Sequence, residues 1–163
     1  VEAGISARRA GAPLVLDTNM ALAGVSQPSL ARLGSAAHCL MAEEAVAQQA
    51  RAEGTTRAVA AARRAAQLYP QAIFAVGNAP TALLALADRI EAGLRPSLVV
   101  GVPVGFVNVV ESKERARDVC SRFGVPAILA MGRKGGSSAA VAICNALLYA
   151  AAHAEDPADR GWQ

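Results

Sequence analysis

Ala72-Ile-Phe-Ala-Val-Gly-Asn-Ala-Pro-Thr81 is the stretch that decides the fold, because it joins a short apolar run to a turn and to the start of a helix. An uninterrupted apolar run of this length is typical of a strand that is buried on both faces of a parallel sheet. Pro80 fits the first turn of a helix, where its missing N–H needs no partner, and Gly93 is suited to end that helix. The stretch therefore predicts a strand over 72–76, a turn over 77–81 and a helix that returns along the sheet.

The same alternation extends outward from this unit in both directions. Further short apolar runs predict strands over 14–16, 36–41, 98–100 and 127–130. Helices are expected over 1–10, 20–24, 43–51, 56–68, 109–122 and 137–152, and Gln27-Pro-Ser29 is interpreted as a loop. Thr55 or Thr56 is expected to cap the helix that runs to residue 68. This pattern predicts an α/β fold, a three-layer α/β/α sandwich with a five-stranded parallel sheet and flavodoxin-like topology; the Rossmann strand order is the alternative. We expect one domain over residues 1–154 and a polar C-terminal tail over 155–163.

Composition and charge restrict the class of protein. Hydrophobic residues make up 53% of the chain, which argues against disorder. The formal net charge of +3 is small and dispersed, so no nucleic-acid partner is expected. The most apolar stretch, Ser97–Val110, is interrupted by glycine and proline and is too short to span a bilayer, so no membrane partner is expected either. The three cysteines and two histidines lack metal-ligand or redox spacing, which predicts no bound metal, reduced thiols and a cytoplasmic location.

Candidate ligand-binding residues fall in the turns that follow the predicted strands, and ligands of open parallel sheets bind beyond the carboxyl ends of the strands. Glycines in such turns let backbone N–H groups approach a ligand, and helix N-termini favour anions. Asp17, at the end of the first strand, is the best single acid. Cations suited to pair with carboxylates are Arg57, Lys113 and Arg133. Helix caps that can also donate to a ligand are expected at Asn78, Thr81, Ser112 and Ser137.

Taken one at a time, these residues have simpler interpretations. Glycine at a strand-to-helix turn is usually only turn chemistry, and Asn, Ser or Thr there usually only caps a helix. Gly101-Val-Pro-Val-Gly105 is not a dinucleotide fingerprint, and Gly132-Arg-Lys-Gly135 lacks the spacing of a P-loop. The residues alone therefore predict an α/β protein that binds an anionic ligand at one edge of its sheet.

Several of these turns together resemble the precorrin-8X methylmutase (precorrin isomerase) family. The resemblance covers roughly residues 11–150 and rests on the order and spacing of seven segments: Gly11-Ala-Pro-Leu-Val-Leu-Asp17 with Met20, Gly54-Thr-Thr-Arg57, Val76-Gly-Asn-Ala-Pro-Thr-Ala-Leu83, Gly101-Val-Pro-Val-Gly-Phe-Val107, Glu111-Ser-Lys113, Gly124-Val-Pro126 and Gly132-Arg-Lys-Gly-Gly-Ser137. It implies a flavodoxin-like fold and a homodimer with a deep pocket for a tetrapyrrole that bears several carboxylates.

The activity that the resemblance implies is that of an isomerase of cobalamin biosynthesis. A methyl group would migrate between adjacent ring carbons, converting precorrin-8X to hydrogenobyrinate, or cobalt-precorrin-8 to cobyrinate, without an organic cofactor. The expected mechanism is a sigmatropic shift assisted by protonation, in which the pocket holds the macrocycle in a reactive pucker.

Pattern and resemblance together give a set of candidate substrate-binding residues: Asp17, Met20, Thr56, Arg57, Gly77, Asn78, Thr81, Gly105, Ser112, Lys113, Arg133, Gly135, Gly136 and Ser137. The resemblance places the family's catalytic histidine upstream of the first strand. No residue here matches it, and His38 falls elsewhere in the pattern, so no catalytic residue is identified. The alternatives are a non-catalytic tetrapyrrole- or corrinoid-binding protein derived from this family, and an unrelated flavodoxin-like nucleotide or regulator domain, which the missing nucleotide fingerprint disfavours.

Overall fold

The strands form one sheet in the part of the chain that the computed structural model describes, residues 1–153 and 156–160. All neighbouring strands are parallel, and their order is β2-β1-β3-β4-β5. The strands are β1 (Leu14–Leu16), β2 (Ala37–His38), β3 (Ile73–Val76), β4 (Leu98–Gly101) and β5 (Ala127–Leu129). This order is flavodoxin-like, so the predicted topology is confirmed and the Rossmann alternative is wrong.

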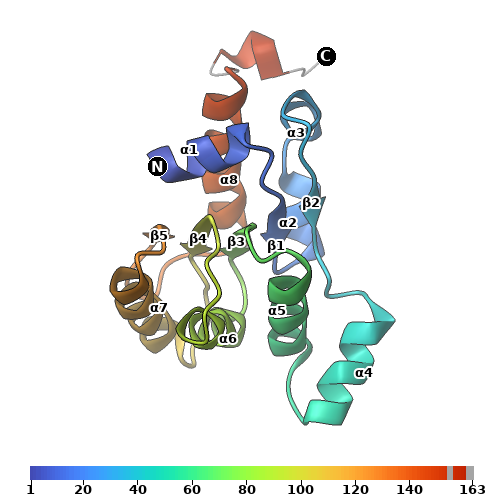
Figure 1. Cartoon of the computed structure of the whole chain (residues 1–163), viewed down its shortest axis with the longest axis vertical. Coiled ribbons are helices and arrows are strands. Elements are labelled where there is room, and N and C mark those ends of the chain that lie inside the picture. The colour runs from blue at the N-terminus through green and yellow to red at the C-terminus, as the bar shows by residue number, and fades with distance from the viewer. Residues whose placement is uncertain (154–155, 161–163) are drawn as a thin grey trace.

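Helices cover both faces of the sheet (Figure 1). One layer consists of α5 (Arg57–Leu68), α6 (Pro80–Glu91) and α7 (Val109–Phe123), and α4 (Glu44–Glu53) packs on α5. The opposite layer consists of α1 (Glu2–Arg9), α8 (Ser137–Ala152) and two short helices that contact α8, α2 (Asn19–Gly24) and α3 (Gln27–Arg32). The three-layer sandwich is confirmed. Because the strands are parallel, their carboxyl ends lie along one edge.

Alternating residues of the central strands divide the core into two halves. In β3, Phe74 and Val76 pack with the α5–α7 layer, whereas Ile73 and Ala75 pack with α8. All four side chains are at most 3% exposed, as a strand covered on both faces requires. The helices meet this sheet largely through alanine, for example at Ala60 in α5, which brings their backbones close to the strands.

Two predicted elements differ from the structure. Gln27-Pro-Ser29 begins α3 instead of forming a loop, because the Ser26 hydroxyl accepts a hydrogen bond from the Ser29 N–H at 3.4 Å and Pro28 occupies the first helical turn. β2 is shorter than the predicted 36–41. It lies at the edge of the sheet, and Leu40 is buried in the core on the α5 side instead of continuing the strand.

Two further expectations concern the membrane and the C-terminus. Among the residues that the structure describes, no helix combines the length and apolar character needed to cross a bilayer. In the tail expected over 155–163, a short 3-10 helix spans Pro157–Arg160, and residues 155 and 161–163 lie outside the described residues. The single domain over 1–154 stays a prediction.

Gly77 allows α8 to approach the turn that follows β3. A Cβ atom at Gly77 would lie 2.7 Å from the Cα atom of Ser137 and 2.9 Å from the Cβ atom of Ala140. A Cα and a Cβ atom have fixed positions on the helix backbone, so they can move only if the start of α8 shifts. The missing side chain at Gly77 therefore sets the position of α8 over β3.

Gly77→Ala should lower the free energy of unfolding by about 1–3 kcal/mol, because the added carbon overpacks the contact with α8. Urea unfolding followed by circular dichroism measures this difference. Ser138→Ala is the matched control: it changes an exposed side chain in the first turn of the same helix, and it should shift stability by less than about 0.5 kcal/mol. Equal stability of the two variants would contradict the argument from close packing.

Candidate functional site

The edge formed by the carboxyl ends of the strands contains a topological switch point between β1 and β3. The chain passes from β1 to β2 on one side and from β3 to β4 on the other. Ligands of open α/β sheets bind in the crevice outside such a point. Asp17 follows β1 and the turn 77–79 follows β3, so two of the predicted segments meet there.

Asp17 connects these two turns through its carboxylate. Its Oδ1 accepts a hydrogen bond from the N–H of Gly77 at 3.0 Å, and its Oδ2 accepts from the N–H groups of Asn78 at 2.7 Å and Ala79 at 3.0 Å. These N–H groups lie at the start of α6, where a helix leaves donors without partners. The protein therefore supplies the anion that the α6 N-terminus favours, and Asp17 is a clamp between two turns instead of a free acid.

The start of α6 does not use the cap chemistry that the sequence suggested. Its N-cap residue is Ala79, and neither Asn78 nor Thr81 caps the helix. Those two cap predictions are wrong because the N–H groups before α6 donate instead to Asp17, in the turn after β1. Asn78 is left with an exposed side chain and Thr81 with a half-buried one, on the ligand side of the switch point.

The start of α8 is tied to the turn after β1. The Thr18 hydroxyl accepts a hydrogen bond from the Ala21 N–H at 3.1 Å and lies 3.2 Å from the hydroxyl of Ser137. Ser137 is the first residue of α8 and follows the N-cap Gly136, so the prediction that Ser137 is the cap is wrong. The side chain of Ser137 is buried in this contact.

The turn after β5 folds over the turn after β4. The N–H of Gly136 donates to the carbonyl of Val102 at 2.8 Å, and a Cβ atom at Gly135 would overlap that carbonyl oxygen. Glycine is the residue that fits so close to another backbone. Contacts therefore join the turns of β4 and β5, just as Asp17 joins those of β1 and β3.

Ser112 and Lys113 lie on α7 and are both fully buried. The Nζ of Lys113 donates to the carbonyls of Gly132 and Lys134, each at 2.8 Å, and burial lowers the pKa of its ammonium group. The hydroxyl of Ser112 donates to the carbonyl of Val109 at 2.9 Å, inside the helix, so the cap prediction for Ser112 is wrong. Both side chains were expected at the surface for a ligand, and their burial corrects that expectation.

Two of the predicted cations remain exposed at this edge. Arg57 is the first residue of α5, which Thr56 caps as predicted by accepting from the Val59 N–H at 3.2 Å. Arg133 lies in the turn after β5 and is also exposed. Neither guanidinium forms an ion pair within residues 1–153 and 156–160, whereas Arg63, for example, pairs with Glu53 at 2.7 Å. The charges of Arg57 and Arg133 are therefore available to a ligand.

Exposed apolar side chains gather in the same turns, and apart from Met20 the sequence did not single them out. The exposed large ones in these turns are Met20, Val104, Phe106, Val107 and Met131. Phe106 is 98% exposed and follows Gly105, whose φ of 142° few other residues adopt. A fully exposed phenylalanine is unusual for a monomer surface, so this turn is suited to meet an apolar partner. An aromatic residue directly after Gly105 was the available signal.

The cavity at the switch point is small. It measures about 30 Å³, lies between β1, β3, α5 and α6, and is lined mostly by apolar side chains such as Ala58, Phe74 and Leu86, with Asp17 at its margin. A water molecule needs roughly 10–15 Å³ on this measure, so the cavity has room for a few waters and not for a tetrapyrrole. A macrocycle bound here must therefore lie across the edge, over the exposed side chains.

A second hollow of about 370 Å³ lies between α6 and α7. Four acidic side chains line it, Glu91, Glu111, Glu114 and Asp118, against two basic ones, Arg115 and Arg122. Its excess of negative charge disfavours a ligand that bears several carboxylates.

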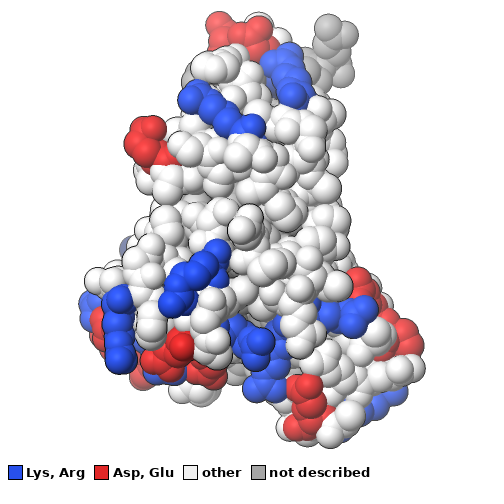
Figure 2. All heavy atoms as spheres, viewed as in Figure 1, with Lys and Arg blue, Asp and Glu red and all other residues white. Residues whose placement is uncertain are grey.

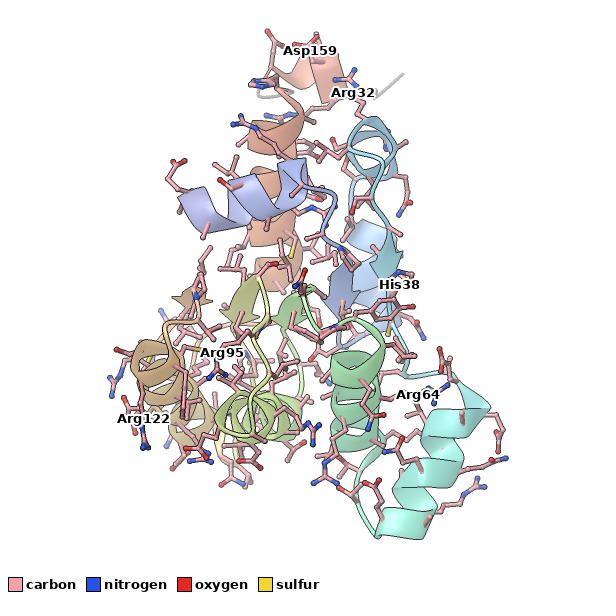
Figure 3. All side chains as sticks on the ribbon, in the orientation of Figure 1. Arg32, His38, Arg64, Arg95, Arg122 and Asp159 are labelled. Carbon is pink, nitrogen blue, oxygen red and sulfur yellow. The ribbon has the colours of Figure 1, made fainter. Side chains whose placement is uncertain are left out.

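The face turned toward the viewer in Figures 2 and 3 carries side chains of both charges. Basic and acidic side chains are intermixed over the lower helices (Figure 2). Arg95 and Arg122, labelled in Figure 3, are positioned over the ring of Phe123, at 5.0 and 5.3 Å from its centre. Arg95 precedes β4, so this pair belongs to the amino edge of the sheet, opposite the switch point.

Several other reactive side chains in the described part of the chain are buried or packed against neighbours. Burial raises the pKa of the Cys120 thiol to about 11 and that of the Cys144 thiol to about 12, so both stay protonated. His38 stacks on Tyr69 with 4.4 Å between ring centres. No group of His, Cys, Asp and Glu within the described ranges is arranged to hold a metal ion. The edge can bind and orient a ligand, and none of these groups is placed there as a nucleophile.

Asp17→Asn should lower the free energy of unfolding by about 1.5–3 kcal/mol, because the amide loses the charge and turns an N–H₂ group toward backbone donors. Thermal and urea unfolding at pH 7 measure the loss. Asp118→Asn is the control, since Asp118 is exposed and forms a surface ion pair with Arg117 at 2.9 Å. That change should cost less than about 0.5 kcal/mol. If Asp17→Asn lowered the free energy of unfolding no more than Asp118→Asn does, the role of Asp17 as a clamp would be refuted.

The chain was compared with known proteins. Residues 1–150 match the profile of the family described as precorrin-8X methylmutase. The cobalt-precorrin-8 methylmutase of Leptospira interrogans is 41% identical over 153 residues, which cover 91% of this chain and 70% of that protein. The corresponding enzyme of Salmonella typhimurium is 46% identical over 134 residues, which cover 82% of this chain and 60% of that protein.

A solved structure gives the same result. The precorrin-8X methylmutase of Thermus thermophilus superposes with a TM-score of 0.80 at 42% identity, over 93% of this chain and 73% of that one. The chain thus spans roughly two thirds of the length of the proteins that it matches. At this identity and coverage the comparison shows common ancestry as well as a common fold. The chain belongs to the precorrin-8X methylmutase family.

Proposed function

We propose that this protein is a methylmutase of cobalamin biosynthesis. It moves a methyl group between adjacent ring carbons of precorrin-8X, or of cobalt-precorrin-8, to give hydrogenobyrinate or cobyrinate. The observation that carries the proposal is the family membership, combined with a carboxyl edge whose exposed groups suit such a ligand. The substrate has two parts, an apolar ring system and a margin of carboxylates, and each part needs its own kind of contact.

In this proposal the carboxylates of the ligand bind to side chains and not to the backbone N–H groups at the start of α6. Asp17 already occupies the N–H groups of Gly77, Asn78 and Ala79, so this helix start repels a further anion. Arg57 and Arg133 are exposed without an ion-pair partner in the described ranges, and a guanidinium can bind a carboxylate with two parallel hydrogen bonds. Asn78 and Thr81, at the start of α6, add neutral hydrogen-bonding groups at the same edge of the sheet.

The ring of the ligand is assigned to the exposed apolar side chains of the same turns. Phe106 and Val107 follow β4, and Met131 follows β5, on the neighbouring strand. Covering Phe106 alone by a ring would remove the apolar surface of one phenylalanine from water, worth about 1.5–3 kcal/mol. A flat macrocycle that rests on these side chains can still direct its margin toward Arg133.

The chemical contribution of these residues is positioning. A methyl shift within one molecule needs the migrating carbon and its acceptor held in the reactive geometry, and fixing that geometry can supply much of the rate enhancement. Turns locked by Asp17, Gly77 and Gly135 provide a rigid support for that purpose. The proposal assigns binding and orientation to this chain, and the proton donor to none of its residues.

A homodimer and a cytoplasmic location complete the proposal. The edge strand β5 is incompletely covered, with Ala127 exposed and Ile128 and Leu129 half-buried, which favours contact with a second copy. Sedimentation at micromolar concentration tests the dimer. Cys39, Cys120 and Cys144 are free thiols, which suits the reducing cytoplasm.

Incubation of the chain with precorrin-8X should change the visible spectrum as the corrin chromophore forms. Hydrogenobyrinate at 100 times its dissociation constant should also raise the free energy of unfolding by about 2.7 kcal/mol, seen as a higher thermal midpoint. Binding without conversion would favour the non-catalytic corrinoid-binding alternative. If the chain neither binds hydrogenobyrinate nor converts precorrin-8X, both tetrapyrrole functions are refuted.

Phe106→Ala should weaken the binding of hydrogenobyrinate by about 1.5–3 kcal/mol through lost apolar contact. Its thermal midpoint without ligand should not change, because the ring is 98% exposed and supports no packing. Absorbance titration gives the dissociation constant. Leu68→Ala, which removes a 51% exposed apolar side chain at the opposite end of α5, should bind as tightly as the parent protein. An unchanged affinity for Phe106→Ala, or an altered sedimentation coefficient, would remove Phe106 from the ligand site.

A further inference from the structure

We infer that Lys113 is a positioning residue, whose buried ammonium group holds the turn 132–136 so that Arg133 is presented to the ligand. The inference rests on the proposed function as far as the ligand is concerned. Its structural part, that Lys113 fixes this turn, stands on the geometry alone. The sequence suggested that Lys113 contacts a ligand carboxylate directly. The positioning role takes the place of that contact.

The contacts of Lys113 are aimed at the two peptide groups around Arg133. Nζ donates to the carbonyl of Gly132 on one side and to the carbonyl of Lys134 on the other, each at 2.8 Å. Both carbonyls are thereby turned toward α7, while the side chain of Arg133 between them is exposed. The orientation of Arg133 is therefore a consequence of where Lys113 places its neighbours.

The turn has little else to fix it. Within the described residues, no other hydrogen bond reaches the backbone between Met131 and Gly135. Gly132 and Gly136 at its ends have φ values of 78° and 126°, and glycine makes such a segment intrinsically mobile. The end of the turn is held by the hydrogen bond from the Gly136 N–H to the carbonyl of Val102, and the hydrogen bonds from Lys113 hold the residues before it.

The burial of Lys113 indicates that its hydrogen bonds to the turn have a function. Its side chain is fully buried with no carboxylate bonded to it in the described part of the chain, and burying a cation in this way is unfavourable. A leucine or methionine would fill the same space in α7 without that cost. What an apolar side chain could not do is bind two carbonyls at once and keep the turn in one conformation.

Limited trypsin digestion tests the structural part without any ligand. Trypsin cuts after Arg133 and Lys134, so Lys113→Met should raise the rate of cleavage in this turn at least about tenfold, because flexible turns are the sites that proteases cut. Cleavage after the exposed Arg51 of α4 is the internal control and should not change. Equal acceleration at both places would mean general destabilisation and would overturn the inference.

A double-mutant cycle on hydrogenobyrinate affinity tests the coupling to Arg133. Lys113→Met and Arg133→Ala should each weaken binding about tenfold, and the double variant should be no more than about threefold weaker than either, because both changes remove one contact. Multiplied losses, near a hundredfold, would overturn the inference. If Lys113→Met does not fold, Lys113→Gln, which keeps a donor on a shorter side chain, replaces it in both experiments. Failure of the parent protein to bind hydrogenobyrinate would refute the proposed function, whereas the cleavage pattern would still decide whether Lys113 fixes the turn.

Discussion

The distance at which backbone segments pass one another at the carboxyl edge is the constraint on which the rest of this structure depends. At Gly77 the turn after β3 touches the first residue of α8, and at Gly135 the turn after β5 touches a carbonyl of the turn after β4. Neither contact leaves room for a side chain. Asp17 and Lys113 bind backbone groups of the same two turns. Close packing and polar contacts therefore hold these turns together.

The polar contacts at this edge also decide which positive groups remain open to a ligand. A parallel sheet with helix starts along one rim offers many N–H groups, and one might assume that they all serve an anionic ligand. Here the carboxylate of Asp17 consumes those of the α6 start, and Ser137 at the α8 start is engaged with Thr18. The positive charge that remains accessible belongs to side chains, among them Arg57, Arg133 and Lys134. Side chains can follow a ligand whose carboxylates are spread around a ring, which a single helix start cannot do.

Much of this arrangement could be predicted from local sequence. The strand–turn–helix over 72–93 and the cap at Thr56 follow from short-range patterns, and they were correct because each is determined within a few residues. Asp17 was found as a residue of interest, but its partners lie in the turn after β3, about sixty residues later, where no local rule could reach them. The burial of Lys113 was missed for the same reason, since a lysine on a charged helix is normally solvated. Long-range contacts thus decided the roles of Asp17 and Lys113, whereas the hydroxyl of Ser112 bonds within its own helix.

The size of the ligand sets a last condition on the edge. A cavity of about 30 Å³ cannot enclose a tetrapyrrole, so the described residues provide a platform and not a closed pocket. On a platform, affinity depends on how well a few exposed side chains are held before the ligand arrives, because each one that must be ordered on binding reduces the gain. Arg133 meets this condition, because it lies between two carbonyls bound by Lys113. The guanidinium of Arg133 is thus carried on backbone that is already fixed, which is the property that an open binding surface needs most.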